Sequence, residues 1–312
     1  MDRNIAKSPE ETTELMAIPE KQLDTWSHQG SVTQSSTTYA TIKRALEAGD
    51  TKYADKSYEV FLQGSYGNDT NIYTESDVDV VIRLDSIFHY DISDLTPEEQ
   101  AWFKTSFADG SYAYADYKAH VIAALEKSFG AADVKAGTKA IKIKANGGRR
   151  NADVVVATQF RRYYSTVAAG PQFERGICFF DSSGNRVANY PKQHSANLTA
   201  KHQATNMWLK PMIRIMKNMR SRLVDDKAIS AGCAPSYFVE GLLYNVPNDK
   251  FGKSYGDTFV AAMNWIFDAK RKELVCANGE YYLMRDSAAN CWPCSDCESF
   301  LQAAAKLWKG WQ

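Results

Sequence analysis

The sequence has no excess of charge of either sign, because its 37 lysine and arginine residues are balanced by 37 aspartate and glutamate residues. A protein that works along nucleic acid usually carries a basic excess. The balance therefore argues against a requirement for double-stranded DNA and against a tRNA-sized acceptor. It leaves room for a local basic pocket that binds a small phosphorylated molecule.

The sequence also lacks any apolar run near the roughly 20 residues that are needed to span a bilayer. Its first residues, "MDRNIAKSPEETTELMAIPEKQ", are polar and acidic, which is not typical of a secretory or transit peptide. Six cysteines in such a chain are expected to be reduced thiols. These absences predict a cytoplasmic protein without a membrane partner.

Hydrophobic periodicity indicates a mixed α/β part followed by a helical part. Strand-like alternation occurs in "YEVFLQ" and "SDVDVVIRL", and "KAIKIKANGGRRNADVVVATQ" and "GICFFDSSGNRVANYP" are typical of hairpins. Helical spacing occurs in residues 20–49 and in "YADYKAHVIAALEKSFG", with a polar and aromatic insertion at 85–111, and it dominates beyond about residue 195. We predict an α/β (α+β) protein with an arm at 1–19, a mixed α/β domain at 20–165, a helical lobe at 166–312 and a cleft between the lobes.

Two aspartates interrupt an apolar strand in "GSYGNDTNIYTESDVDVVIRL". Asp77 and Asp79 are two residues apart, so their side chains leave a strand on the same face. Burying like charges together is costly unless a cation lies between them. Asp153 begins "DVVVA", a second apolar strand that can pair beside the first. Three such carboxylates predict an oxygen-lined site for two Mg²⁺ ions, which suits phosphoryl or nucleotidyl transfer.

The strand before these aspartates ends in Gly64 and Ser65, followed by more turn-forming residues. Such a turn exposes backbone N–H groups and a hydroxyl that can bind a triphosphate. The alternative is an ordinary loop followed by an edge strand with solvated aspartates. The combination of this turn with two aspartate-bearing strands favours the metal-dependent enzyme.

These motifs resemble the catalytic signature of the DNA polymerase β-like nucleotidyltransferase superfamily. Within it, the chain is similar to the cGAS/DncV-like nucleotidyltransferases, or CD-NTases, of bacterial anti-phage (CBASS) signalling. The resemblance extends from about residue 20 to the C-terminus and includes "LKPMIRIMKNMRSR" and "APSYFVEGLLY". It implies a polymerase β-like core with a mixed sheet, and a helical second lobe like that of oligoadenylate synthetase, with the active site in the cleft.

The resemblance also implies roles for individual residues. Asp77 and Asp79 would hold two Mg²⁺ ions, for which Mn²⁺ can substitute, and Asp153 would complete the metal that activates the acceptor hydroxyl. The donor triphosphate would be held by Gly64, Ser65 and Lys217, whereas Tyr237, next to Ser236, would stack on a nucleobase. The implied substrate-binding residues are Gly64, Ser65, Lys217, Ser236 and Tyr237.

The implied reaction condenses nucleoside triphosphates, ATP and GTP first and pyrimidine nucleotides as a further option, into a cyclic di- or trinucleotide. Pyrophosphate is released, and the product would activate a separate anti-phage effector, with a regulatory protein as a further partner. One alternative is transfer of a nucleotide to a protein, a tRNA or a small molecule. Another is a non-catalytic nucleotide sensor, which three intact carboxylates argue against.

Two groups of basic residues allow more than one interpretation. Lys210, Arg214 and Lys217 are spaced by four and three residues and share one helix face, which either binds phosphates or is solvated. Without the resemblance, Tyr237 would be assigned to core packing. A second group precedes Asp153, and we expect it to face water or a regulatory surface. Its members are Lys142, Lys144, Arg149 and Arg150.

Four cysteines in the C-terminal part have the spacing of a zinc site. They are Cys276, Cys291, Cys294 and Cys297. The alternative is a helix that follows Pro293 and is capped by Ser295 or Asp296, with the thiols packed as small apolar groups. No histidine is close in sequence, which favours the helix. We expect four of the histidines to be structural or surface residues, namely His89, His120, His194 and His202.

Overall fold

The computed structural model describes residues 17–73, 77–108, 110–167, 170–286 and 291–311, so most of the predicted arm at 1–19 lies outside the described residues. The chain forms two compact units. The α/β unit comprises Val32–Gln63 and Ser76–Pro191, and the helical unit comprises Met1–Ser31, Gly64–Glu75 and Lys192–Gln312. Each unit is therefore built from stretches that are not contiguous in the sequence.

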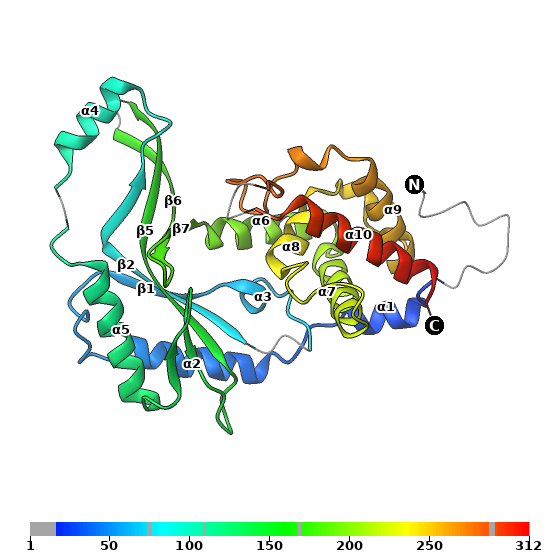
Figure 1. The fold of residues 1–312 in the computed structure, drawn as a ribbon, viewed down its shortest axis with the longest axis horizontal. Coiled ribbons are helices and arrows are strands. Elements are labelled where there is room, and N and C mark those ends of the chain that lie inside the picture. The colour runs from blue at the N-terminus through cyan, green and yellow to red at the C-terminus, as the bar shows by residue number, and fades with distance from the viewer. Residues whose placement is uncertain (1–16, 74–76, 109, 168–169, 287–290, 312) are drawn as a thin grey trace. The chain divides into compact units, whose positions relative to one another are not determined.

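The α/β unit is built on a mixed sheet, drawn in Figure 1, whose strand order is β1-β2-β5-β4-β3, with β6 paired to β5 and β7 to β6. The pair β2–β5 is parallel, and the other pairs are antiparallel. The predicted hairpins at residues 141–157 and 176–191 are confirmed by the pairs β4–β5 and β6–β7. The strands are β1 (Tyr58–Leu62), β2 (Val78–Asp91), β3 (Val134–Ala136), β4 (Ile141–Ile143), β5 (Ala152–Val167), β6 (Gly170–Phe180) and β7 (Arg186–Asn189).

Helices complete this unit. Helices α2 (Thr33–Leu46) and α5 (Tyr114–Phe129) contact each other and the sheet (Figure 1). The segment predicted as an insertion at 85–111 instead contains the end of β2 and a further helix, α4 (Pro97–Ser106). This helix begins with a capping box between Thr96 and Glu99, and its Phe103 packs against Leu95 and Tyr163.

The predicted domain boundary at 165/166 differs from the boundary between the units. That position lies inside β5, which continues into the antiparallel partner β6. A hairpin exchanges backbone hydrogen bonds along its length, so its two strands stay in one unit. The helical unit resumes only at Lys192, and it also takes up the stretch Gly64–Glu75 from between β1 and β2.

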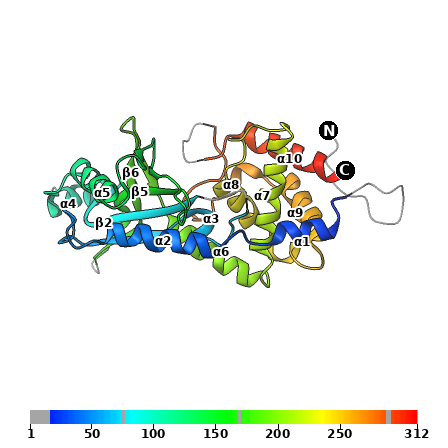
Figure 2. The ribbon, with the colours of Figure 1, turned by 90° about the horizontal axis from the view of Figure 1, so that it is seen from below.

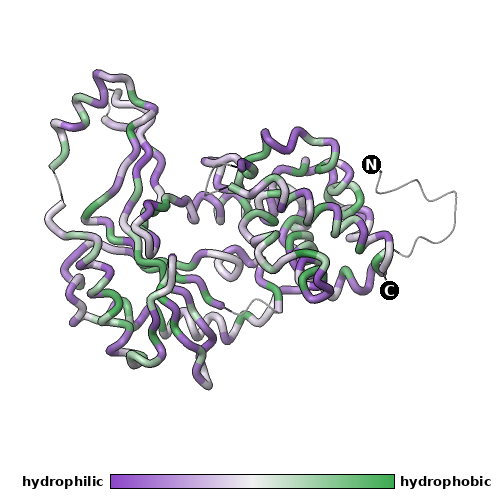
Figure 3. The backbone as a smooth tube through the Cα atoms, in the orientation of Figure 1, coloured by the Kyte–Doolittle hydropathy of each residue, from purple (hydrophilic) through white to green (hydrophobic). Residues whose placement is uncertain are grey.

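The helical unit packs around α7, which contacts α1, α8, α9 and α10. Figure 2 shows α1 alongside α7 and α9, and Figure 3 shows hydrophobic and hydrophilic residues alternating along these helices. Among the described residues, no helix is both long and apolar enough to cross a membrane. The helices are α1 (Glu20–Ser27), α3 (Gly64–Gly67), α6 (Pro191–Ala204), α7 (Leu209–Asp225), α8 (Ser236–Asn245), α9 (Tyr255–Asp268) and α10 (Cys294–Lys309), with short 3-10 turns η1 (Asn248–Lys250) and η2 (Arg271–Glu273).

The start of α10 differs from the prediction. A helix does follow Pro293, but its first residue is Cys294, so neither Ser295 nor Asp296 is the N-cap. The carboxylate of Asp286 accepts a hydrogen bond of 2.9 Å from the Cys294 backbone N–H. A side chain from the preceding loop thus caps the helix, which spacing within the helix cannot reveal.

The four cysteines with the spacing of a zinc site do not form a metal cluster in the described part of the chain. Cys276 and Cys297 are buried, and burial raises the pKa of each thiol to about 12. The thiol of Cys291 donates to the Tyr282 carbonyl oxygen at 3.1 Å. No group of three or more His, Cys, Asp or Glu side chains among the described residues is gathered closely enough to hold a metal ion.

Candidate active site

The predicted metal-binding carboxylates lie on the sheet of the α/β unit. In the parallel register of β2 and β5, Asp79 lies directly beside Asp153. Side chains at directly paired positions share one face, with Cβ atoms about 5 Å apart. Asp77 precedes β2, and the hydrogen bond of 3.0 Å from Val78 N–H to Asn151 O aligns the starts of both strands. The three carboxylates therefore belong to one face at the beginning of the strand pair.

Alternation along the strands explains why these residues adopt this arrangement. Val78 and Val80 on β2 and Val154 on β5 are fully buried. Because successive side chains point to opposite faces, burying these valines turns Asp79 and Asp153 to the other face. A register shift of one residue would bury the carboxylates among apolar side chains, so the register is strongly specified.

The local charges indicate a site for a cation. Burial raises the pKa of the Asp153 carboxyl, Lys142 opposes this rise, and the neighbouring Asp77 adds to it. Carboxylate oxygens are the ligands that Mg²⁺ prefers, and a divalent ion relieves the repulsion between neighbouring carboxylates. In the described structure these three side chains are not close enough together to enclose a metal ion. Their chemistry and their shared face nevertheless fit a divalent ion.

Lys142 is a residue of this site that the sequence analysis assigned to water or a regulatory surface. It is exposed, yet it lies directly opposite Asp153 in the β4–β5 pair, and Lys135 lies opposite Lys142 in the β3–β4 pair. The sheet thus carries a row of Asp79, Asp153, Lys142 and Lys135. The alternation of lysines with isoleucines was the signal, but only the strand register shows that these lysines share the face of the carboxylates.

The other two members of that basic strip have partners inside the α/β unit. Arg149 forms an ion pair of 3.3 Å with Asp133 and lies 4.5 Å from the Phe129 ring centroid. The Arg150 guanidinium donates to Gln34 Oε1 at 3.1 Å. The expectation that Arg149 faces water is therefore wrong, because local carboxylate and aromatic groups bind it. The contact of Arg150 is exposed, so its orientation toward water or a regulatory surface stays a prediction.

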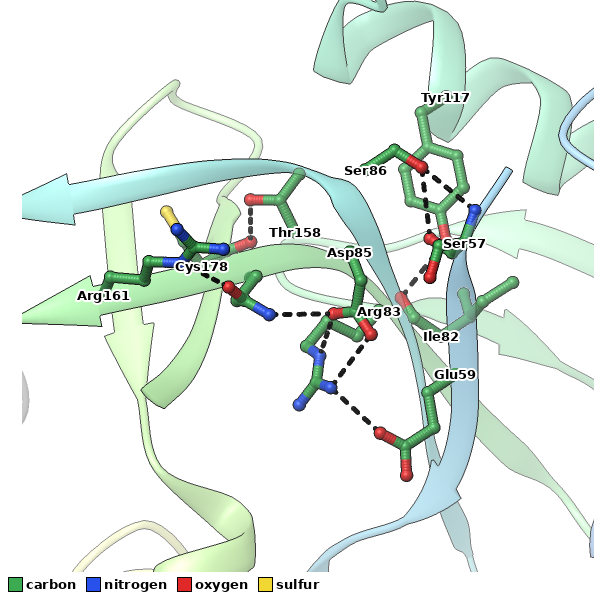
Figure 4. A network of polar contacts seen from close by, with 11 residues as sticks. Ser57, Glu59, Ile82, Arg83, Asp85, Ser86, Tyr117, Thr158, Arg161 and Cys178 are labelled. Atoms are coloured by element: carbon green, nitrogen blue, oxygen red, sulfur yellow. Dashed lines mark hydrogen bonds and ion pairs between the residues drawn. The ribbon is translucent and has the colours of Figure 1, made fainter. Parts of the chain in front are cut away.

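A buried polar cluster lies farther along the same face of β2 (Figure 4). Arg83, only 4% exposed, donates to Asp85 at 2.6 Å and to Glu59 on β1 at 2.9 Å. The side chain of Gln159 on β5 also donates to Asp85, at 3.4 Å. Arg83 is four positions after Asp79, which is about 13 Å along a strand. This cluster ties β1, β2 and β5 together and is too distant to bind the same metal.

The predicted triphosphate ligands Gly64 and Ser65 lie in the helical unit. We call residues 64–73 the substrate segment. Gly64 has φ of 67°, a conformation that favours glycine, and it starts the short helix α3. Backbone hydrogen bonds close the segment, from Asn68 N–H to Gly64 O at 3.1 Å and from Thr70 N–H to Ser65 O at 2.9 Å.

The basic face of α7 binds this segment. Lys210 forms an ion pair of 3.0 Å with the Asp69 carboxylate, and Arg214 donates to the Asp69 carbonyl oxygen at 2.6 Å. Lys217 donates to the Thr70 carbonyl oxygen at 2.9 Å and is fully buried. A solvated basic face is therefore wrong for Lys217 and Lys210. The contact of Lys217 with a triphosphate stays a prediction.

The predicted base-stacking region begins α8. Arg220 donates to the Ser236 hydroxyl at 3.0 Å. Tyr237 is partly buried, its ring stacks on His194 at 4.8 Å, and its hydroxyl accepts from Asn278 at 2.9 Å. Stacking of Tyr237 on a nucleobase stays a prediction.

The four histidines have partners within their own units. His89 contacts the Thr158 hydroxyl at 2.7 Å, His120 contacts the Tyr112 hydroxyl at 2.7 Å, and His194 contacts Glu240 at 2.7 Å. His202 accepts a hydrogen bond of 3.3 Å from the Lys210 backbone N–H. Each of the four histidines therefore contacts other side chains or backbone groups of the fold, as expected for structural residues.

His202 makes the stability of the helical unit depend on pH. Burial, followed by the charges of Lys210 and Arg214, lowers its pKa from 6.5 to about 4. The unfolded chain therefore binds more protons between pH 6.5 and 4, and His202 makes the free energy of unfolding fall as the pH drops through this window. We expect His202→Gln to flatten this loss in urea unfolding measured from pH 7 to 4. An equal slope in both proteins would contradict the assignment.

Known proteins resemble this chain over nearly its whole length. The family model for the cGAS/DncV-like nucleotidyltransferase C-terminal helical domain matches residues 196–309. The cyclic UMP-AMP synthase of Rhodothermus marinus is 40% identical over 297 residues, which are 95% of this chain and 99% of that protein. The cyclic nucleotide synthase CdnE01 of Staphylococcus haemolyticus is 33% identical over 305 residues, which are 95% of this chain and 100% of that protein. The chain belongs to the cGAS/DncV-like nucleotidyltransferases.

This CD-NTase also shares its fold with solved members. A structure of the Rhodothermus marinus CdnE c-UMP-AMP synthase with Apcpp and Upnpp matches with a TM-score of 0.84 at 39% identity, covering 94% of this chain and 97% of that one. The polymerase β-like fold with a mixed sheet and a helical second part is thereby confirmed. The CD-NTase is a nucleotidyltransferase that condenses nucleoside triphosphates into cyclic oligonucleotides, in a family that depends on divalent metal.

Proposed function

We propose that this CD-NTase condenses ATP and UTP into a cyclic dinucleotide, with release of pyrophosphate. The observation that carries the choice of bases is the similarity, over 95% of the chain, to a relative named a cyclic UMP-AMP synthase. UTP falls within the pyrimidine option left open by the sequence, in place of the first expectation of ATP and GTP. The paired Asp79 and Asp153 support the chemistry.

The carboxylates supply the metal site of this mechanism. Asp77, Asp79 and Asp153 would hold two Mg²⁺ ions, or Mn²⁺ in their place, which supply activation of a ribose hydroxyl and charge neutralisation of the leaving pyrophosphate. Lys142 lies beside Asp153 and lowers the negative charge density on this face. The carboxylates of this row lie on β2 and β5, and its lysines lie on β4 and β3.

The residues that we propose to bind substrate are all in the helical unit. Gly64 and Ser65 would contact the donor triphosphate, because their turn presents backbone N–H groups and a hydroxyl. Lys217 and Ser236 would contribute further polar groups, and Tyr237 would stack on a base. Lys217 would need to release the Thr70 carbonyl, or share its ammonium between that oxygen and a phosphate.

The cyclic dinucleotide would act as a second messenger in the cytoplasm. It would activate a separate effector against phage, and a regulatory protein would control the synthase. Balanced charge, with 37 basic and 37 acidic residues, supports activity without double-stranded DNA.

A product assay tests the proposed function. Purified protein is incubated with Mg²⁺ and pairs of nucleoside triphosphates, each radiolabelled in turn, and products are treated with phosphatase and identified by mass. We expect a phosphatase-resistant dinucleotide from ATP with UTP, absent with the Asp77→Asn/Asp79→Asn variant. A product of other bases would overturn the choice of UTP, and labelled protein, tRNA or small molecule would favour the acceptor-modifying alternative.

A further inference from the structure

We infer that Glu240 is a positioning residue, which holds the substrate segment in the shape that binds the donor triphosphate; this inference rests on the proposed function. Glu240 lies on α8 and is 2% exposed, and both oxygens of its carboxylate are bonded to side chains of the helical unit. Its carboxylate accepts hydrogen bonds from the Thr70 hydroxyl and from the Asn68 amide, the latter at 3.1 Å. Both donors belong to the substrate segment, 170 and more residues away in the chain.

His194 supports Glu240 from the other side. Its Nε2 lies 2.7 Å from the carboxylate, whereas its buried Nδ1 has no hydrogen-bond partner among the described residues. Because a carboxylate oxygen only accepts, the Nε2 atom carries a proton and donates it to Glu240.

The countercharge for Glu240 comes from α7. Burial alone would raise the pKa of Glu240, but the hydrogen bond and the charge of His194, the charge of Lys217 and the hydrogen bond from Thr70 lower it overall. Lys217 donates to the carbonyl oxygen of Thr70, whose hydroxyl donates to Glu240. Thr70 is thus held between a buried cation and a buried anion, each bonded to a different atom of the same residue.

Backbone hydrogen bonds connect Asn68 and Thr70 to Gly64 and Ser65, the residues that we propose to bind the triphosphate. Thr70 N–H donates to Ser65 O at 2.9 Å, and Asn68 N–H donates to Gly64 O at 3.1 Å. Between them, Asp69 has φ of 56°, a left-handed conformation that is uncommon for a residue with a side chain. Holding Asn68 and Thr70 therefore maintains the turn at Asp69 and sets where Gly64 and Ser65 lie.

The test uses Glu240→Gln in the full chain. With its oxygen kept toward Asn68 and His194, the new amide turns its N–H groups toward the Thr70 hydroxyl, so the hydrogen bond that Thr70 donates is lost together with the negative charge near Lys217. We expect the backbone amides of Asn68 and Thr70 to exchange hydrogen at least about tenfold faster, with the amides of α10 unchanged. The KM for the donor nucleotide should rise about tenfold, and kcat should change less than about threefold.

Two further variants make the result decisive. Glu273→Gln, which changes the same charge at a side chain 70% exposed in the helical unit, should behave as the wild type. Thr70→Val removes only the hydroxyl that Glu240 accepts from, and it should speed exchange at the same amides if Glu240→Gln does not fold.

Three results would overturn the inference. These are unchanged exchange at Asn68 and Thr70, equal acceleration in α10, which indicates general destabilisation, and faster local exchange with an unchanged KM. If the wild-type protein makes no product from any nucleoside triphosphates, the proposed function fails instead. The affinity of the wild type and Glu240→Gln for Apcpp with Mg²⁺, measured by calorimetry, then replaces KM as the readout.

Discussion

Replacing Asp79 by asparagine is expected to lower the rate of nucleotide condensation by at least about 10³-fold. Stabilisation of the transition state by bound metal ions contributes several kcal/mol, and each 1.4 kcal/mol that is lost lowers the rate about tenfold. Asp79 lies beside Asp153 on the paired strands, so its loss removes one of two directly paired carboxylates. The fold should remain intact, because asparagine has the same size and relieves repulsion. The measurement is the initial rate of pyrophosphate release with saturating Mg²⁺.

A matched control separates this effect from a loss of surface charge. Asp94→Asn removes a carboxylate that is 53% exposed and forms only a long ion pair of 3.7 Å with Arg162. Its rate should stay within about twofold of the wild type, because exposed ion pairs contribute little. Mg²⁺ should raise the melting temperature of the wild type and of Asp94→Asn but not that of Asp79→Asn. An Asp79→Asn rate within tenfold of the wild type would refute the role of this carboxylate.

Replacing Trp292 by alanine is expected to lower the free energy of unfolding by about 3–5 kcal/mol, the usual cost of removing a large buried aromatic side chain. Trp292 is fully buried, and its indole N–H donates to the Cys233 carbonyl oxygen at 2.7 Å. The ring stacks on Phe238 at 5.7 Å with an interplanar angle of 7°. The substitution leaves both a cavity and an unsatisfied carbonyl in the helical unit.

The measurement is urea unfolding followed by circular dichroism. Trp102→Ala serves as the control, because Trp102 on α4 is 45% exposed and its loss should change the unfolding free energy by less than about 1 kcal/mol. Since domains are stable by only about 5–15 kcal/mol, Trp292→Ala should also reduce the yield of folded protein. A loss below about 1 kcal/mol would show that the residues around "CWPC" are held by something other than this packing.

The shared face of the three carboxylates was predictable because strand periodicity is a local property. The alternation of side chains along a strand was enough to predict that Asp77 and Asp79 share a face. The apolar run that follows Asp153 was enough to predict a second strand there. The helical spacing of "YADYKAHVIAALEKSFG" is likewise local, and it matches α5, which is followed by Gly130 with φ of 83°. Each of these predictions depends only on residues that are close together in the sequence.

Other features depended on partners that are remote in sequence. Lys142 joins the carboxylate row only through the register of β3, β4 and β5. The cap of α10 comes from Asp286 in the preceding loop, and the substrate segment bonds to Glu240 on α8. Sequence spacing does not report such contacts, because any of several polar residues can satisfy the same backbone group.

The sequence alone determined the fold class, the paired aspartates and the chemistry that they imply, because alternation and charge are set by neighbouring residues. Tertiary structure alone decided that Lys217 is buried against Thr70 and that the substrate segment belongs to the helical unit. A lysine on a helix face has the same local pattern whether it is solvated or buried. Which of these it becomes depends on the acceptors that folding brings to it, here the Thr70 carbonyl and the carboxylate of Glu240 beyond it.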